Sequence, residues 1–142
     1  MRIEAQRELV ASRPDVWALL AEPQHLSDWW PGYATIRPDR RGLAEGARWQ
    51  VTRGGAIGLL RRPESEGLVV ITAAEPELHL GWRDIQQAYS ADLRLEPAPD
   101  GKTRAALLVE GAAWRLVLEG LRPLPRQALA RLHALCQTAA SL

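Results

Sequence analysis

Alternating apolar and polar residues in the middle of the chain predict β-strands. The clearest case is Gln86–Glu96, whose apolar positions share one face of the expected strand: Tyr89, Ala91, Leu93 and Leu95. The Asp100-Gly101 pair that follows is a common hairpin turn, so Thr103–Gly111 is predicted to return as its antiparallel partner. The same criteria predict further strands at Ile3–Val10, Ala34–Arg40, Ala47–Arg53, Ala56–Arg61, Leu68–Ala74 and Leu78–Ile85, with a tight turn at Gly54-Gly55 and a loop at Pro63–Gly67.

Two short helices are predicted after the first strand. Ser12 is a good N-cap and Asp15 follows it by three residues, so one helix is expected to run to about Ala21. A second is expected over residues 23–30, where Pro31-Gly32 ends it.

The C-terminal part of the chain has a helical period. Its apolar residues recur every three or four positions and predict one long amphipathic helix: Leu121, Leu124, Ala128, Leu132, Leu135 and Ala139. The apolar stretch Gly111–Leu121 just before it has two interpretations, an extension of the last strand or an early start of the helix.

The predicted order of elements is β-α-α, about six strands and a long helix, which defines an α+β fold. Consecutive strands joined by short turns form an antiparallel meander. One face of such a sheet needs an apolar cover, and the C-terminal helix is the large amphipathic element that remains for it. We therefore expect residues 1–142 to form one domain, in which a curved sheet wraps around that helix and leaves a ligand pocket between the two.

Composition argues against several classes of protein. The chain has 46% hydrophobic and 25% charged residues, which is ordinary for a globular domain. Its formal net charge of +1 predicts neither a nucleic-acid partner nor general attraction to an acidic membrane. No apolar run is long enough to span a bilayer, and Met1–Glu8 lacks the apolar core of a signal peptide. Because a single cysteine excludes an intramolecular disulfide, we expect a cytoplasmic protein. We expect it to be a monomer or a homodimer.

Several short motifs occur in an order that is found in a known superfamily. They are Ser12–Leu20 after the first strand, Leu26–Gly32 as a second helix, Gly46–Trp49 at the start of a strand, Trp82 within a strand, the Asp100-Gly101 hairpin and the closing helix. Over essentially its whole length the chain thus resembles the START/polyketide cyclase–dehydrase (SRPBCC) superfamily, whose helix-grip fold is shared with pollen-allergen proteins. The resemblance implies that fold and a pocket. It implies no particular reaction, because the superfamily includes lipid carriers, hormone receptors, ring cyclases and quinone-binding proteins.

The aromatic residues are the main candidates for a pocket wall. The chain has six tryptophans, two tyrosines and no phenylalanine. Tryptophan combines a large apolar surface with one N–H donor, so it suits either a core or a ligand site. The ligand-binding residues are expected to be Trp30, Trp49, Trp82, Tyr89, Leu93, Trp114, Leu132 and Cys136, with plain core packing as the alternative for each.

Asp84 and Tyr89 are the candidate catalytic residues. Asp84 shares strand parity with Trp82, and a carboxylate pointing into an apolar cavity could serve as a general acid or base. Alternatively, the strand frays and Asp84 is solvated, and Glu110 has the same two interpretations. The Tyr89 hydroxyl could bind a ligand carbonyl.

Arg48 and Arg94 could orient a ligand carboxylate by a bidentate contact, with a solvated position as the alternative. Arg48 and Arg94 alternate with apolar neighbours and belong on the outer face of the sheet, as does His79, whose parity is opposite to that of Trp82. The three histidines are far apart in the sequence and show no metal-binding spacing, so no metal is predicted. Cys136 is expected to be a small buried thiol.

The favoured hypothesis is a protein that binds a hydrophobic small molecule, such as a lipid, a quinone or an aromatic polyketide, without a cofactor. The first alternative is a polyketide cyclase or dehydratase in which Asp84 or Tyr89 moves protons. The second is a protein-interaction module with a closed core. The sequence leaves open whether the protein is an enzyme.

Overall fold

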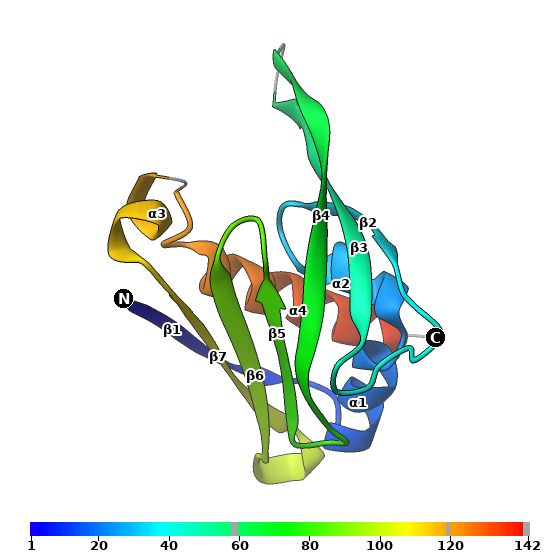
Figure 1. The fold of residues 1–142 in the computed structure, drawn as a ribbon. Coiled ribbons are helices and arrows are strands. Elements are labelled where there is room, and N and C mark those ends of the chain that lie inside the picture. The colour runs from blue at the N-terminus through cyan, green and yellow to red at the C-terminus, as the bar shows by residue number, and fades with distance from the viewer. Residues whose placement is uncertain (58–59, 119, 141–142) are drawn as a thin grey trace.

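The computed structural model describes residues 1–57, 60–118 and 120–140. Within these residues, seven strands form one curved sheet in the order β1-β7-β6-β5-β4-β3-β2, with every neighbouring pair antiparallel (Figure 1). The predicted α+β helix-grip architecture is confirmed. The strands are β1 (Arg2–Leu9), β2 (Tyr33–Arg37), β3 (Arg48–Ile57), β4 (Leu60–Glu75), β5 (His79–Asp84), β6 (Tyr89–Pro97) and β7 (Thr103–Gly111).

Helices cover one face of this sheet. The long helix α4 (Leu124–Ala140) crosses that face, with α1 (Arg13–Leu20) and α2 (Leu26–Trp29) beside it (Figure 1). Helix α1 begins as predicted, because the Ser12 hydroxyl accepts a hydrogen bond from the backbone N–H of Asp15 at 3.4 Å.

Two 3₁₀ turns and a short helix complete the described elements. The turn η1 (Pro23–His25) leads into α2, and η2 (Pro99–Gly101) forms the β6–β7 hairpin at the predicted Asp-Gly pair. The segment that the sequence left open forms a separate helix, α3 (Ala113–Leu118), after β7 has ended. It lies at the end of the sheet from which the β3–β4 hairpin projects (Figure 1).

The core lies between the sheet and α4. Alternate strand residues point towards the helices, as the period of two predicted, and α4 contributes one face of its helical repeat. The fully buried side chains of this core include Val69, Ile71, Trp82, Ala91, Leu93, Leu107 and Val109 from the strands and Ala128, Leu129, Leu132 and Cys136 from α4.

Three sequence-based boundaries around β3 and β4 are wrong. Gly54-Gly55 is not a turn, because β3 continues to Ile57 and pairs there with Leu60. The two glycines instead accompany a shift of register between Arg53 and Gly55, which is the bulge that glycine tolerates within a strand. The expected strand Ala56–Arg61 and loop Pro63–Gly67 therefore belong to the long hairpin of β3 and β4.

His79 is the other residue whose environment differs from the prediction. It lies on the outer face, as its parity required, but it is buried rather than solvated. Two carboxylates flank its ring: Nε2 lies 2.7 Å from Asp92 Oδ1, and Nδ1 lies 3.6 Å from Glu75 Oε1. The acidic side chains of the neighbouring strands thus shield the imidazole from water.

Candidate functional site

A buried cluster of polar side chains lies on the inner, helix-covered face of the sheet, at the end that carries the β3–β4 hairpin. Its centre is Asp84, the last residue of β5, which is fully buried. Tyr33 opens β2, Tyr89 opens β6, Arg53 comes from β3 and Trp30 follows α2. We refer to these five residues as the Asp84 cluster. The structure therefore places Asp84 in the interior, and the alternative of a frayed, solvated residue is wrong.

The carboxylate of Asp84 is surrounded by donors. The Arg53 guanidinium contacts both of its oxygens through Nη2, and only 11% of the Arg53 side chain is exposed. The Tyr33 hydroxyl donates to Oδ2 at 2.7 Å, and the backbone N–H of Gln87 donates to Oδ1 at 3.0 Å. A buried carboxylate needs this many donors, since an unpaired charge in the core is strongly unfavourable.

Hydrogen bonds run in one direction from Trp30 to Asp84. Because the carboxylate can only accept, the single proton of Tyr33 points to Asp84, and Tyr33 must accept the proton of Tyr89 across 3.0 Å. Tyr89 in turn accepts from Trp30 Nε1 at 3.0 Å. Burial raises the pKa of both tyrosines well above the usual value, and the charge of Asp84 adds to the shift.

Gly67 on β4 gives Arg53 the room to reach Asp84. Arg53 and Asp84 belong to strands on opposite sides of β4, where their partners are Ser65 and Val69, and Gly67 lies between these two. A Cβ atom at residue 67 would lie 2.8 Å from Arg53 Nη2. The missing side chain is therefore what allows an arginine from β3 to cross the strand and pair with a carboxylate on β5.

Gly67→Ala is expected to lower the free energy of unfolding by about 1–3 kcal/mol, because the added methyl forces the Arg53 guanidinium away from Asp84. Urea denaturation measures this loss. Repeating the substitution in an Arg53→Ala background is the matched control, since the clash has no partner there. An equal loss in both backgrounds would contradict the role given to Gly67.

Aromatic rings form an apolar wall beside the Asp84 cluster. Trp82 meets Trp30 and Trp29 edge-on, with ring centroids 4.8 and 5.8 Å apart, and Trp30 stacks near Tyr89 at 6.2 Å. Among the described residues, Trp82 Nε1 and Arg53 Nε are buried and have no hydrogen-bond partner. Buried donors without partners are rare because they are costly, so the interior offers two N–H groups to an acceptor.

The structure brings together only part of the predicted ligand-binding set. Trp30, Trp82 and Tyr89 lie in contact within the site, and Leu93, Leu132 and Cys136 belong to the same buried core. Trp49 is also buried, but its Nε1 already donates to the carbonyl of Gly42 at 2.8 Å. Trp114 lies apart from all of them, on α3, with 66% of its surface exposed.

Arg53 and Tyr33 are the site residues that sequence reasoning missed. A signal was present for Arg53, which continues the inward parity of Trp49 and Val51 on β3. The expected turn at Gly54-Gly55 hid it, because a residue next to a turn is normally solvated. Nothing in the local pattern of Tyr33 distinguishes it from an ordinary strand residue.

The other polar candidates lie outside the Asp84 cluster. Arg48 and Arg94 are exposed on the outer face, as predicted, and Glu110 is exposed and lies 3.6 Å from Arg2. Cys136 is fully buried, and burial raises the pKa of its thiol to about 11. A nucleophilic thiolate at neutral pH is therefore unfavourable here.

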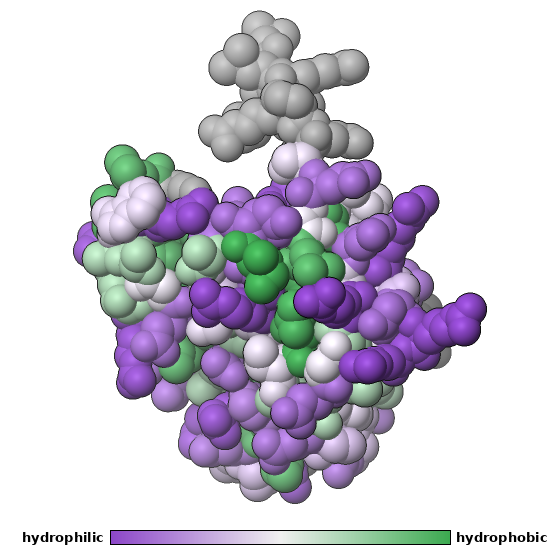
Figure 2. Space-filling view, viewed as in Figure 1, coloured by the Kyte–Doolittle hydropathy of each residue, from purple (hydrophilic) through white to green (hydrophobic). Residues whose placement is uncertain are grey.

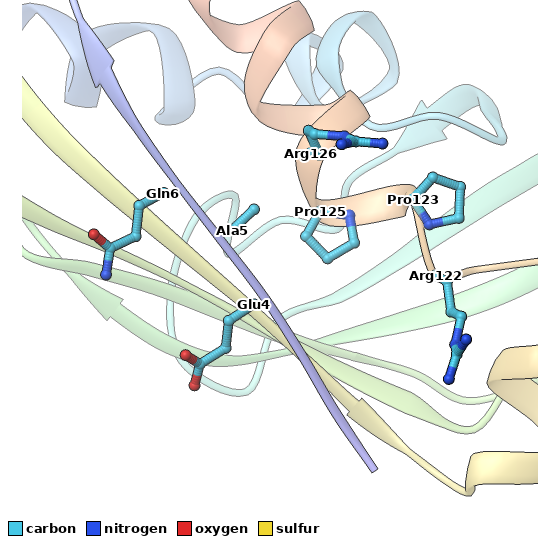
Figure 3. Close-up of a pocket in the computed structure, with 7 residues that line it drawn as sticks. All are labelled: Glu4, Ala5, Gln6, Arg122, Pro123, Pro125 and Arg126. Carbon is cyan, nitrogen blue, oxygen red and sulfur yellow. The ribbon is translucent and has the colours of Figure 1, made fainter.

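A surface groove of about 590 Å³ is separate from the Asp84 cluster. Figure 3 shows its two walls, one from β1 and the other from the start of α4. It is lined by Glu4, Ala5, Gln6, Arg122, Pro123, Pro125 and Arg126. In the part of the chain that the structure describes, no three His, Cys, Asp or Glu side chains gather as a metal site would require. None of the helices described is long and apolar enough to cross a membrane.

Comparison with protein families gives a match over nearly the whole chain. The sequence model for polyketide cyclase / dehydrase and lipid transport proteins matches residues 1–138. The chain belongs to this family. The resemblance to the SRPBCC superfamily is thereby confirmed, whereas no curated protein matches the chain.

Solved structures share the fold of this polyketide cyclase/dehydrase and lipid transport family member. A protein of Nitrosomonas europaea, NE0264, superposes with a TM-score of 0.78 at 19% identity, over 100% of this chain and 97% of its own. A protein of Arthrobacter aurescens gives 0.76 at 19% identity, covering 96% and 86%. The Thermus thermophilus protein TTHA0849 gives 0.71 at 16% identity, covering 98% and 99%. At these identities the likeness establishes the fold alone.

Proposed function

We propose that this family member binds a hydrophobic small molecule that carries a hydrogen-bond acceptor, between the inner face of the sheet and helices α2 and α4. The observation that carries the proposal is Trp82 Nε1, a fully buried N–H without a partner among the described residues, in the middle of an aromatic wall. A ligand carbonyl or carboxylate would satisfy this donor, and the rings of Trp29, Trp30 and Trp82 would hold a flat apolar body. Lipids, quinones and aromatic polyketides all have this chemistry.

The same geometry favours binding over acid–base catalysis. Both Asp84 oxygens are occupied by Arg53, Tyr33 and the Gln87 amide, so the carboxylate has no obvious position for a substrate proton. Tyr89 is protonated at neutral pH, its raised pKa makes the phenolate still harder to form, and its proton already points to Tyr33. The alternative is a cyclase or dehydratase that uses Asp84 or Tyr89. Its substrate would first have to break the hydrogen bonds that link Tyr89, Tyr33 and Asp84.

The ligand would have to displace part of the aromatic wall, since the three tryptophan rings touch one another in this structure. Helix α2 is the natural part to move. It has only four residues, Leu26–Trp29, and it is followed by Gly32, whose positive φ of 96° marks a bend that other residues rarely adopt. A shift of α2 would carry Trp29 and Trp30 away from Trp82.

Trp82→Phe tests this proposal, because it removes the indole N–H together with the five-membered ring that carries it and keeps one aromatic ring in place. Tryptophan fluorescence and native mass spectrometry, with a panel of a fatty acid, a ubiquinone and an aromatic polyketide, would first identify a ligand. The variant is then expected to bind it about tenfold more weakly, the value of one hydrogen bond. Trp17→Phe is the matched control, since Trp17 lies on α1 away from the Asp84 cluster.

Two results would overturn the proposal. One is the absence of binding to every member of the panel, which would favour the interaction module with a closed core. The other is equal affinity of wild type and Trp82→Phe for the ligand that binds, which would remove Trp82 Nε1 from the site.

A further inference from the structure

Helix α3 carries an apolar stripe that faces outward. Trp114, Val117 and Leu118 are three and four residues apart, which places them on one side of the helix. Their exposed fractions are 66%, 53% and 78%. Leu116 is the buried apolar residue of α3, and its side chain packs near Gly111. Figure 2 shows the resulting apolar surface (green) over α3.

This helix is apolar on two sides, since it buries Leu116 and also exposes Trp114, Val117 and Leu118. An amphipathic helix usually buries its apolar stripe and exposes its polar side. Elsewhere in the described chain the large exposed apolar residues come from different loops or chain ends: Met1, Val10, Leu78 and Ile85. A second apolar patch (green) lies on the outer face of the sheet, at the centre of Figure 2. Three exposed apolar side chains on one side of a short helix form a contiguous surface, which is a candidate binding surface.

Arginines lie on α3 and shortly after it in the chain. The Arg115 guanidinium lies 5.7 Å from the centroid of the Trp114 ring, and its Nη2 donates to the carbonyl of Gln86 at 3.0 Å. Arg122 and Arg126 follow at the start of α4 and are exposed along one wall of the surface groove, opposite Glu4 (Figure 3). Residues 113–126 contain three arginines and one glutamate, so the segment has a formal net charge of +2 in a chain whose total is +1.

We propose that α3 docks this protein onto an anionic lipid surface, with Trp114, Val117 and Leu118 inserted among the acyl chains and Arg115, Arg122 and Arg126 at the level of the headgroups. Tryptophan and arginine both suit such an interface, because each joins an apolar body to a polar group. Attraction is local, since the net charge of the whole chain provides no long-range field.

A lipid surface fits the stripe better than a protein partner does. Stable protein interfaces take about 20–30 residues from each side, and α3 offers six residues with three exposed apolar side chains. Binding of an interfacial helix to a membrane scales with its buried apolar area plus the attraction of nearby positive charge to anionic lipids, so it does not require a surface of that size. The docking surface is separate from the proposed ligand site. The hydrogen bond from Arg115 to the Gln86 carbonyl joins α3 to the loop that contacts Asp84, so docking would bring that end of the sheet to the lipid.

Co-sedimentation with vesicles tests the docking surface without any ligand. Wild-type protein is expected to sediment with vesicles of equimolar phosphatidylcholine and phosphatidylserine, less with phosphatidylcholine alone, and less again as salt is added. A double variant, Trp114→Ser with Leu118→Ser, is expected to bind the mixed vesicles about tenfold more weakly or worse. Arg122→Glu is expected to weaken binding to the mixed vesicles only.

Leu78→Ser is the matched control. Leu78 is an apolar residue of 48% exposure in the β4–β5 turn, at the opposite end of the sheet, and its substitution is expected to leave vesicle binding unchanged. Because all of these side chains are exposed, circular dichroism should show the same fold in each variant. The proposal is overturned if wild type does not bind the mixed vesicles, or if Leu78→Ser and the double variant bind alike. It is also overturned if the stripe instead mediates dimerisation, seen as a dimer that only the double variant loses.

Discussion

Asp84→Asn is expected to lower the free energy of unfolding by about 3–5 kcal/mol, the largest effect of any single substitution considered for this protein. The amide has nearly the shape of the carboxylate but removes its charge, so the Arg53 guanidinium stays buried without a counter-ion. It also replaces one carboxylate oxygen, which accepts from Arg53 and from either Tyr33 or the Gln87 amide, by an NH₂ group that cannot accept. Urea denaturation followed by circular dichroism measures the loss.

A double-mutant cycle separates the ion pair from other effects of the substitution. Combining Asp84→Asn with Arg53→Gln removes both charges, so the combined loss should be smaller than the sum of the two single losses. Asp92→Asn is the control on the outer face, where the Asp92 side chain is 31% exposed and a loss below about 1 kcal/mol is expected. Additive losses at Asp84 and Arg53 would show that the pair is not coupled.

Alkaline pH is expected to unfold the protein through Tyr33 and Tyr89. Their folded-state pKa values are raised, whereas in the unfolded chain each ionises near the usual value of about 10. Below that pH both states hold the protons and stability is unaffected. Above it the unfolded state loses protons first, so the free energy of unfolding falls by about 1.4 kcal/mol per pH unit for each tyrosine until the folded-state pKa is reached.

The measurement is direct because the chain contains only these two tyrosines. Phenolate absorbance should not develop at their ordinary pKa but should rise together with the loss of the circular dichroism signal, as the protein unfolds. Tyr89→Phe should roughly halve the slope of stability against pH. Phenolate absorbance that develops near pH 10 in folded protein would contradict the buried, hydrogen-bonded environment of both hydroxyls.

Much of the fold could be predicted because it depends on periodic burial. The alternation in Gln86–Glu96 and the helical spacing after Leu121 directly reflect which side chains face the core, so β6, β7 and α4 lie close to where they were expected. The long β3–β4 hairpin was harder to predict. Gly-Gly pairs and prolines usually mark turns. Here Gly54-Gly55 accompanies a bulge in β3, and Pro63 lies in a part of β4 that pairs with β3 on one side only.

The site was only partly predictable because it depends on contacts between strands. The parity of Asp84 with Trp82 gave its inward direction, but its side-chain partners Tyr33 and Arg53 come from two strands, β2 and β3, that lie far away in the sequence. Their meeting follows from strand order and register, which local patterns do not encode. Trp114 shows the converse: its apolar neighbours suggest burial, and only the position of α3 beyond the sheet exposes it.

The passage of Arg53 across Gly67 affects how this end of the sheet opens. The Arg53 side chain bridges β3 to β5 over the middle strand, and hydroxyl groups continue the link through β2 and β6 to the end of α2. If one of these segments moved away alone, a buried charge or hydrogen-bond donor on another segment would lose its partner. Local fluctuations at this corner should therefore be concerted, with backbone amides of all five segments exchanging their hydrogens at a common rate.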